Sequence, residues 1–114
     1  MSDCIFCRII AGEIPSDTVY EDEKVIAFKD INPMAPVHIL IIPKQHIASL
    51  QEIAETHTGI IGHVTRVAHK LAIKTDIADT GYRLVINNGP MSGQMVQHLH
   101  MHLLGGKMMD GQLG

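Results

Sequence analysis

Three histidines alternate with apolar residues near the C-terminal end of the chain. His98, His100 and His102 lie in the segment QMVQHLHMHLLGG, with Leu99 and Met101 between them. Side chains at every second position of a strand point to the same face. We therefore expect the three rings to line one face and the apolar residues the other. Buried imidazoles need hydrogen-bond partners, so the histidine face should border a polar cleft.

The spacing of the triad argues against one shared metal ion. Along a strand, His98 and His102 would be separated by about 13 Å. A zinc ion bonds imidazole nitrogen at about 2.1 Å, so it could hardly reach all three rings. Each ring is therefore expected to have a separate role along an extended ligand, and nucleophilic or acid–base chemistry is the main candidate.

The segment before the triad, NNGPMSGQM, resembles a phosphate-binding loop. Gly89 and Gly93 allow several main-chain N–H groups to turn toward one point, and such concavities bind phosphate oxygens. Asn87 adds an amide donor. A plain turn between two strands would have the same composition. Its position directly before the triad favours a phosphate held within reach of an imidazole.

The composition limits the classes of function. The chain has 114 residues, a formal net charge of −3, and 46% apolar residues. Its longest apolar run, HILIIP, is far shorter than the roughly 20 residues of a membrane-spanning helix. No basic segment followed by a long apolar segment marks a signal peptide at the start. We expect a cytoplasmic protein with no membrane and no nucleic-acid partner.

The hydrophobic pattern predicts one α+β domain over residues 1–114. Alternating or continuous apolar runs rich in β-branched residues predict strands. One apolar stripe at helical spacing predicts a long helix, and the histidines that fall in it are interpreted as surface or boundary residues. The predicted strands are 18–22, 24–30, 37–44, 82–89 and 98–106, and the predicted helices are a short one over 4–13 and a long one over 56–77. This order predicts a mostly antiparallel sheet with one long helix packed on it.

The segment HLHMHLL resembles the signature of the histidine triad family. The resemblance extends to CIFCRIIAGEIPSDTVYED, AFKDINPMAPVHILIIPKQHI and VINNGPMSGQMVQHLHMHLLGG, which together leave out little more than the long helix. It is greatest to the Hint-like nucleoside phosphoramidases and nucleotide-binding proteins. This implies a mostly antiparallel five-stranded sheet with one long helix and a second, short helix at the N-terminus. It also implies a homodimer whose two sheets join into one of ten strands.

The resemblance also implies an activity. His100 would attack the α-phosphorus of a purine nucleoside phosphoramidate, such as adenosine monophosphate joined to an amine. Water would then release the nucleoside monophosphate from a covalent nucleotidyl-histidine. His38 matches the family's fourth histidine, which orients the nucleophile. His102 matches the third triad histidine, near the phosphate and leaving group, where an imidazolium could stabilise charge or protonate the amine. No metal is needed at the reaction centre.

The nucleotide contacts follow from the same resemblance. One residue is expected to accept the ribose hydroxyls, three to enclose the base, and the rest to form the phosphate loop. Those enclosing the base could equally be plain core residues. Asp30 would accept hydrogen bonds from the ribose hydroxyls. Phe28, Ile31 and Ile14 would enclose the base. The phosphate loop would consist of Asn87, Gly93, Gln94 and Met95.

Cys4 and Cys7 form a Cys-x-x-Cys motif close to the N-terminus. A thioredoxin-like site needs a strand before the motif, and there is no room for one. A structural zinc site needs about four ligands. Bacterial-type relatives supply the other two from positions that correspond here to His46 and His98. Zinc would then stabilise the fold rather than take part in catalysis. Two unligated, partly buried thiols are the alternative.

Two departures from the family pattern keep other functions open. Relatives often carry a hydroxyl residue where this chain has Met95, and a thioether cannot donate a hydrogen bond; Ser92 could substitute if the loop bends. The chain also lacks tryptophan, which lines the partner's site in some relatives. A nucleotide-binding or scaffold protein with little turnover is therefore the main alternative. A metal-dependent hydrolase using two triad histidines and His38 is a third.

Overall fold

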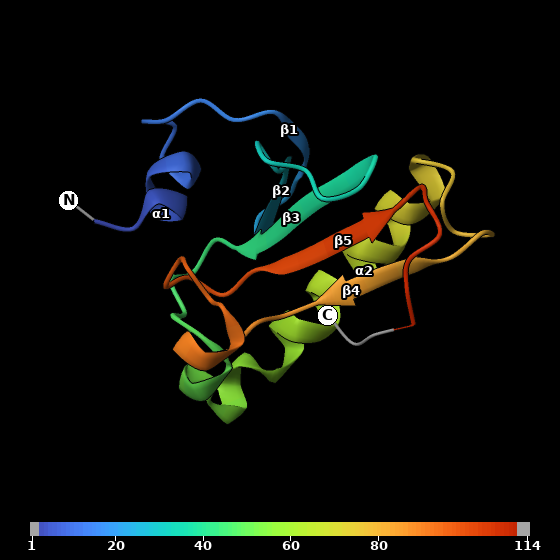
Figure 1. Cartoon of the computed structure of the whole chain (residues 1–114). Coiled ribbons are helices and arrows are strands. Elements are labelled where there is room, and N and C mark those ends of the chain that lie inside the picture. Colours follow the sequence, from blue (N-terminus) through green and yellow to red (C-terminus); the bar gives the residue numbers. More distant parts are fainter. Residues whose placement is uncertain (1–2, 112–114) are drawn as a thin grey trace.

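Five antiparallel strands form one sheet in the computed structural model, which describes residues 3–111 (Figure 1). Their order across the sheet is β1-β2-β3-β5-β4. The strands are β1 (Thr18–Glu21), β2 (Val25–Lys29), β3 (Val37–Pro43), β4 (Tyr82–Val85) and β5 (Met101–Gly105), and the helices are α1 (Ile5–Ile10) and α2 (Thr58–Lys74). Short 3₁₀ turns lie at Leu50–Glu52 (η1), Glu55–His57 (η2) and Pro90–Ser92 (η3). The predicted α+β class, the antiparallel sheet and the two helices are confirmed.

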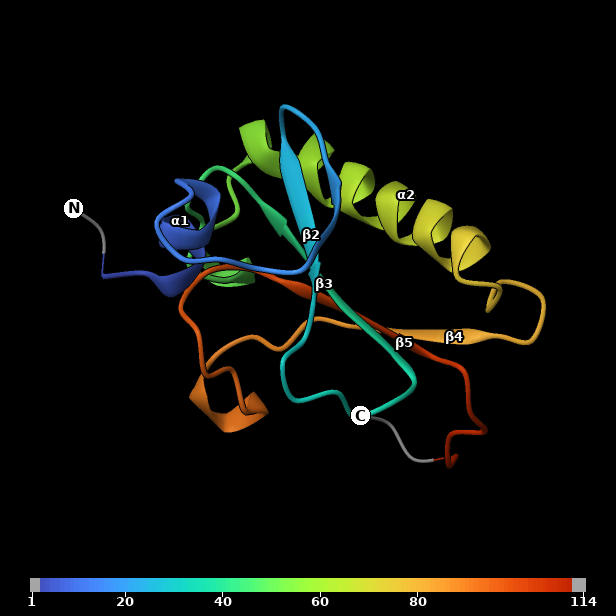
Figure 2. The same cartoon turned by 90° about the horizontal axis from the view of Figure 1, so that it is seen from above.

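Helix α2 lies along one face of the sheet (Figure 2). Its predicted apolar stripe is buried at Val64, Val67 and Leu71. These side chains pack against alternate strand residues, namely Val25, Ala27, Ile39, Ile41, Met101 and Leu103. The burial of this stripe is the main source of the helix's stability, because propensity alone contributes little. Among the described residues, no helix is both long enough and apolar enough to cross a membrane.

The opposite face of the sheet carries the strand residues that alternate with those packed against α2. Phe28 of β2 and Leu40 of β3 are buried there and pack against Phe6 of α1. His38 of β3 and His102 of β5 point to this same face, because each is an even number of positions from the buried residues beside it. The face that α2 leaves uncovered therefore positions the histidines.

The last strand begins later than predicted. A strand was expected over 98–106, but β5 begins only at Met101. Continuing its register with β3 would place Leu99 opposite Pro43, which has no N–H to donate. The N–H of Leu99 donates instead to the carbonyl of Ile47, at 2.6 Å. The first two triad histidines therefore precede the strand and are held by other contacts.

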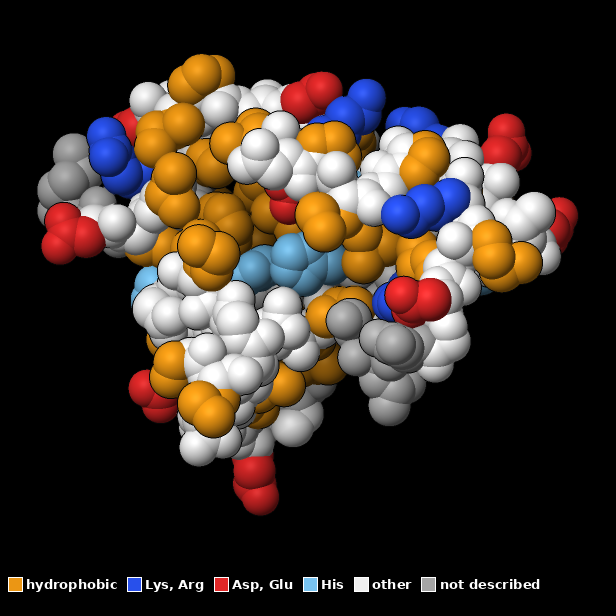
Figure 3. All heavy atoms as spheres, in the orientation of Figure 1, with side chains coloured by type: hydrophobic (Ala, Val, Ile, Leu, Met, Phe, Trp, Pro, Cys, Tyr) orange, Lys and Arg blue, Asp and Glu red, His pale blue; other side chains and the backbone are white. Residues whose placement is uncertain are grey.

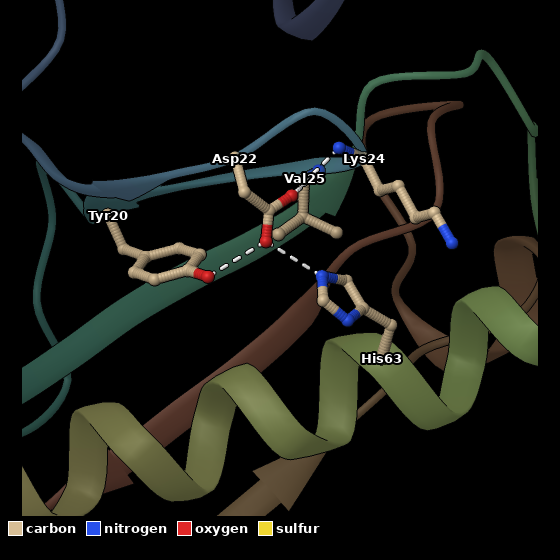
Figure 4. Close-up of polar contacts among 5 residues, drawn as sticks. All are labelled: Tyr20, Asp22, Lys24, Val25 and His63. Carbon is tan, nitrogen blue, oxygen red and sulfur yellow. Dashed lines mark hydrogen bonds and ion pairs between the residues drawn. The ribbon is translucent and has the colours of Figure 1, made fainter.

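One carboxylate ties the β1–β2 hairpin to α2 (Figure 4). Oδ2 of Asp22 accepts hydrogen bonds from the hydroxyl of Tyr20 at 2.8 Å and from Nε2 of His63 at 2.7 Å. Oδ1 accepts from the N–H groups of Lys24 and Val25 at 2.7 and 2.9 Å. His63 is thus a boundary residue of the helix, as predicted, and it lies on the α2 side of the sheet.

Candidate active site

The sheet face opposite α2 is hollowed beside the histidines, and hydrophobic side chains surround the hollow (Figure 3). A cavity of about 700 Å³ opens there between α1, β2 and the segment before β5. The predicted site residues that line it are Ile14, Phe28, Asp30, Ile31, Asn87, Gly93, Met95, His100 and His102. Residues from five separate parts of the sequence are therefore brought to one cavity.

The ring of His100 is held in one orientation. Its Nδ1 lies 2.7 Å from the main-chain oxygen of His98. A carbonyl can only accept, so Nδ1 carries the proton and Nε2 of the neutral ring keeps its lone pair. The ring of Phe6 packs edge-on against it, with centroids 5.1 Å apart and planes at 85°. His100 is only 8% exposed but lines the cavity. The arrangement offers a preset nitrogen nucleophile.

A chain of hydrogen bonds sets the tautomers of the other two histidines. The N–H of Met34 donates to Nδ1 of His38 at 3.0 Å, so the proton of His38 is on Nε2. That Nε2–H lies 2.9 Å from Nδ1 of His102 and 3.4 Å from Oδ2 of Asp30. Since Nδ1 of His102 accepts, its own proton is on Nε2. His102 therefore presents an N–H donor.

Both of these rings are neutral near pH 7. Burial, helped by the neighbouring His100 and His38 and opposed by the carboxylate of Asp30, lowers the pKa of His102 to about 4. Burial also lowers the pKa of His38, although the carboxylate of Asp30 opposes the shift. The free protein thus offers a neutral N–H from His102 and not the imidazolium considered from the sequence.

The loop before the triad is shaped by two glycines and one amide. Gly89 and Gly93 have φ of +86° and +90°, which glycine adopts with little strain. The side chain of Gln94 is buried, and its oxygen accepts from the N–H of Gly89 at 2.8 Å. Its nitrogen donates to the carbonyls of Ala48 and Val96 at 2.8 and 3.1 Å. Gln94 thus uses its amide to hold the loop.

The hydroxyl considered as a substitute at the phosphate is hydrogen-bonded within its own turn. Oγ of Ser92 donates to the carbonyl of Gly89 at 2.7 Å. Ser92 lines a second cavity, whereas His100 lines the first. Met95 is 91% exposed at the wall of the first cavity, so a flexible thioether lies where the family resemblance predicts a hydroxyl.

Four metal-binding side chains converge beside the first triad histidine. Nδ1 of His98 lies 3.3 Å from Sγ of Cys4 and 3.2 Å from Nδ1 of His46, which is itself 3.2 Å from Sγ of Cys7. Nε2 of His98 donates to the carbonyl of Pro43 at 2.7 Å, so the lone pair of Nδ1 points into the cluster. Tetrahedral zinc with bonds of about 2.1 and 2.3 Å would place its donors roughly 3.4–3.8 Å apart. The donor set and its spacing fit zinc.

Comparison with known proteins places these residues in a family. Residues 11–109 match the HIT domain family. The chain belongs to the HIT family. Among its HIT relatives, the purine nucleoside phosphoramidase of Escherichia coli K12 is 47% identical over 111 residues, covering 97% of this chain and 93% of that protein. The 14 kDa zinc-binding protein of Zea mays is 52% identical, covering 96% and 86%.

Solved HIT structures have the same fold. A HIT family hydrolase from Clostridium thermocellum superposes with a TM-score of 0.96 at 52% identity, covering 99% of this chain and 98% of that one. A HIT family hydrolase from Legionella pneumophila gives a TM-score of 0.96 at 44% identity, covering 98% and 100%. The homologues of this chain therefore include hydrolases.

Two contributors to this HIT site were missed by the sequence reasoning. Phe6 contacts the rings of both His98 and His100, with centroids 5.9 and 5.1 Å apart. The sequence offered one indication of this role: Phe6 lies between Cys4 and Cys7, and metal binding by the two cysteines would hold the Phe6 ring against the sheet. The main-chain N–H of Met34, which sets the tautomer of a histidine, carried no signal in the sequence.

Proposed function

We propose that this protein hydrolyses purine nucleoside phosphoramidates, in which an amine is joined to the phosphorus of a nucleoside monophosphate. The proposal rests on one observation, the 2.7 Å contact that leaves the lone pair of His100 Nε2 beside the cavity. Neutral imidazole is an effective nucleophile near pH 7 because its ordinary pKa is about 6.5. The similarity to the phosphoramidase of Escherichia coli supports the substrate class.

The reaction proceeds through two displacements at phosphorus. Nε2 of His100 attacks, a new N–P bond forms, and the bond from phosphorus to the amine breaks. The amine leaves with the electron pair and takes up a proton from water. A second water then attacks phosphorus and gives up a proton to solvent, and the bond to His100 breaks. The electron pair returns to Nε2, and nucleoside monophosphate is released.

The other two histidines assist without changing charge. His102 donates its Nε2–H to a phosphate oxygen as charge builds up during attack. His38 holds His102 in this tautomer through the 2.9 Å hydrogen bond. This arrangement disfavours a metal bound by both, since Nε2 of His38 carries the proton where a ligand needs a lone pair. The Nδ1 of that ring already accepts from Met34.

The nucleoside occupies the first cavity. The carboxylate of Asp30 accepts hydrogen bonds from the ribose hydroxyls. Its Oδ1 also accepts a hydrogen bond from the N–H of Asn32 at 2.8 Å, which fixes the orientation of the carboxylate. The base lies between the ring of Phe28 and the branched side chains of Ile31 and Ile14. Ile31 is 92% exposed and lines the first cavity, so a bound base would cover it. The phosphate is held by Asn87, Gly93 and the main chain of Gln94 and Met95.

Zinc bound by Cys4, Cys7, His46 and His98 would have a structural role. Two thiolates and two imidazoles leave no open position in a tetrahedral site, which is typical of structural zinc. The ligands join the start of α1 to the segment that carries His100. Zinc therefore stabilises the fold and lies outside the reaction centre.

The protein acts as a homodimer of HIT domains, each formed by residues 1–114. Strand β4 lies at the edge of the sheet, and all four of its residues are only half-buried. An exposed edge of this kind pairs readily with a second strand. Pairing of β4 with the partner's β4 would join two five-stranded sheets into one of ten strands. Light scattering after size exclusion tests this, and a monomer at micromolar concentration would contradict it.

A nucleotide-binding protein with little turnover is the second candidate. Met95 favours it, because its exposed thioether cannot donate a hydrogen bond to the departing nitrogen. Tight binding of adenosine monophosphate, with no release of product from a phosphoramidate over hours, would decide for this candidate.

The covalent intermediate gives the sharpest test. The protein is mixed with an adenosine phosphoramidate, quenched with acid after milliseconds to seconds, and digested for mass spectrometry. We expect an adenylyl group on the peptide that contains His100, and its absence from the His100→Asn variant. The matched control is His69→Asn, because His69 is exposed on α2. Turnover that persists in His100→Asn would overturn the mechanism, and loss of turnover with chelator in folded protein would favour the metal-dependent alternative.

A further inference from the structure

A second cavity, of about 790 Å³, lies beside the first on the same face of the sheet. His102 and Asn87 line both cavities, so they form the wall between them. His100, in contrast, lines the first cavity and not the second. In an in-line displacement the leaving group departs on the side opposite the nucleophile. The second cavity is therefore placed to receive the group that leaves.

The strand register directs a cation into this second cavity. His102 lies opposite Val85, and Leu104 lies opposite Arg83. Opposed residues share a face, so Arg83 is the diagonal neighbour of His102, with Cα atoms about 7–8 Å apart. The guanidinium of Arg83 donates through Nη2 to the main-chain oxygen of Asp110 at 2.9 Å. This contact uses only part of its five-donor fork.

The charges around this cavity favour an anion. Arg83 and Lys107 line it, and Asp110 is the one acidic side chain among its lining residues. The local balance is thus positive, although the whole chain has a formal net charge of −3. Asp30 lies beyond His38 on the side of the first cavity, where its carboxylate contacts Nε2 of His38 at 3.4 Å. The attraction is therefore local to the second cavity.

We infer that the second cavity selects leaving groups that carry a carboxylate, which Arg83 and Lys107 bind. This inference rests on the proposed function and specifies its substrate: a nucleoside phosphoramidate formed on the amino group of an aliphatic amino acid. Met34 and Leu104 add apolar surface to the cavity, which suits the carbon chain between amine and carboxylate. Arg83 and Lys107 are thus specificity-determining residues.

The test compares two substrates that differ only in charge. Adenosine phosphoramidates of 4-aminobutyrate and of its neutral amide have the same length and amines of similar basicity. We expect kcat/KM to favour the carboxylate by about three- to fivefold at low salt, the size expected for exposed ion pairs, and the preference to shrink as salt is added. Lys107→Gln should remove most of the preference, and Asp110→Asn should increase it.

Matched controls separate local from global charge. Lys70→Gln and Arg66→Gln remove one positive charge each from the exposed surface of α2, on the other face of the sheet, and should leave the preference unchanged. Lys107 is exposed, so Lys107→Gln should fold normally, and Arg83→Gln serves as the second variant. An equal or lower kcat/KM for the carboxylate, or a preference that survives Lys107→Gln together with Arg83→Gln, would overturn the inference.

A binding experiment distinguishes failure of this inference from failure of the proposed function. In His100→Asn, the affinities for the two conjugates are measured without chemistry. Tighter binding of the carboxylate conjugate, lost in the Lys107→Gln background, supports the subsite even if the protein hydrolyses neither compound. Equal affinities refute the subsite even if both compounds are hydrolysed.

Discussion

His98 connects the candidate metal site to the candidate nucleophile. Its ring directs Nδ1 toward Sγ of Cys4, at 3.3 Å, while its main-chain oxygen accepts a hydrogen bond from Nδ1–H of His100 at 2.7 Å. The two-residue spacing of His98 and His100 therefore has a structural effect besides placing both rings on one face. It places a carbonyl beneath the ring that must keep its proton on Nδ1. Because this segment precedes the ladder of β5, the cluster is one of the contacts that hold it.

Removal of one zinc ligand should loosen this end of the molecule without removing the chemistry. In Cys7→Ser the cluster loses a thiolate, and the zinc bound per chain should fall from about one to well below one. The midpoint of thermal unfolding should drop by about 5–15 °C, because metal binding contributes directly to folding. Activity should fall but remain measurable at temperatures where the variant is folded.

The control for this prediction is a histidine outside the cluster. His46→Ala should behave like Cys7→Ser, whereas His69→Ala should keep its zinc and lose at most the small stabilisation of its exposed 3.3 Å contact with the Tyr82 hydroxyl. Full retention of zinc by both cluster variants, measured by elemental analysis, would contradict the assignment of the ligands.

The stability of the protein should depend on pH through His102. Burial lowers its pKa to about 4 in the folded state, against about 6.5 in the unfolded chain. Between these values the unfolded state binds more protons, so the free energy of unfolding should decrease as pH falls from about 6.5 to about 4. Above pH 7 this residue should contribute no pH dependence, since both states are neutral.

Urea unfolding at several pH values, with zinc held in excess, measures this effect. His102→Gln should reduce the slope of stability against pH over that interval, while His69→Gln, on the exposed surface of α2, should not. An identical slope in wild type and His102→Gln would show that the ring is not buried in a neutral form.

The sequence predicted the faces of the sheet better than the connections across it. Alternation within the triad segment was enough to separate His102 from Met101 and Leu103, which pack on the α2 side of the sheet. The late start of β5 was not predictable, because it depends on Pro43 lying opposite Leu99, and that register is a tertiary feature. Convergence of the cysteines with His46 came only from the resemblance, since 39 residues separate the two contacting side chains of Cys7 and His46.

Met95→Ser should accelerate turnover. The thioether at this position is 91% exposed and lines the cavity of His100, so a shorter residue should fit without strain. A hydroxyl there could donate to the leaving group or phosphate, and one added hydrogen bond of this kind is worth about 1 kcal/mol, or about fivefold in kcat. Met95→Ala separates the hydroxyl from the loss of bulk. Equal rates for the serine and alanine variants would refute a hydroxyl effect.

Gln94→Leu should weaken phosphate binding through the loop. The amide of Gln94 accepts one hydrogen bond and donates to two carbonyls within 3.1 Å, so leucine would leave buried main-chain groups without partners. We expect KM for a phosphoramidate and Kd for adenosine monophosphate to rise together by about tenfold, a loss of about 1.4 kcal/mol. Gln97→Leu is the matched control, because Gln97 is exposed. An unchanged Kd in Gln94→Leu would mean that the loop holds its shape without this side chain.

Asp22 should matter for stability and not for catalysis, because it lies on the α2 side of the sheet. Burial alone would raise the pKa of its carboxyl group, but the hydrogen bonds from Lys24, His63, Val25 and Tyr20 outweigh burial and hold that pKa well below its usual range. Asp22→Ala should lower the free energy of unfolding by about 2 kcal/mol. The stabilisation by Asp22 should be present above pH of about 4 and lost as acid protonates the carboxylate.

Two further variants separate the tie to the helix from the turn of the hairpin. His63→Ala removes only the contact between α2 and Asp22, so it should cost less than Asp22→Ala, and the double variant should cost less than the sum of the two. Asp79→Ala, at an exposed position, is the control for loss of a carboxylate. Turnover per folded molecule should be unchanged in all four proteins. Additive losses from Asp22→Ala and His63→Ala would mean that the 2.7 Å contact between them adds nothing to stability.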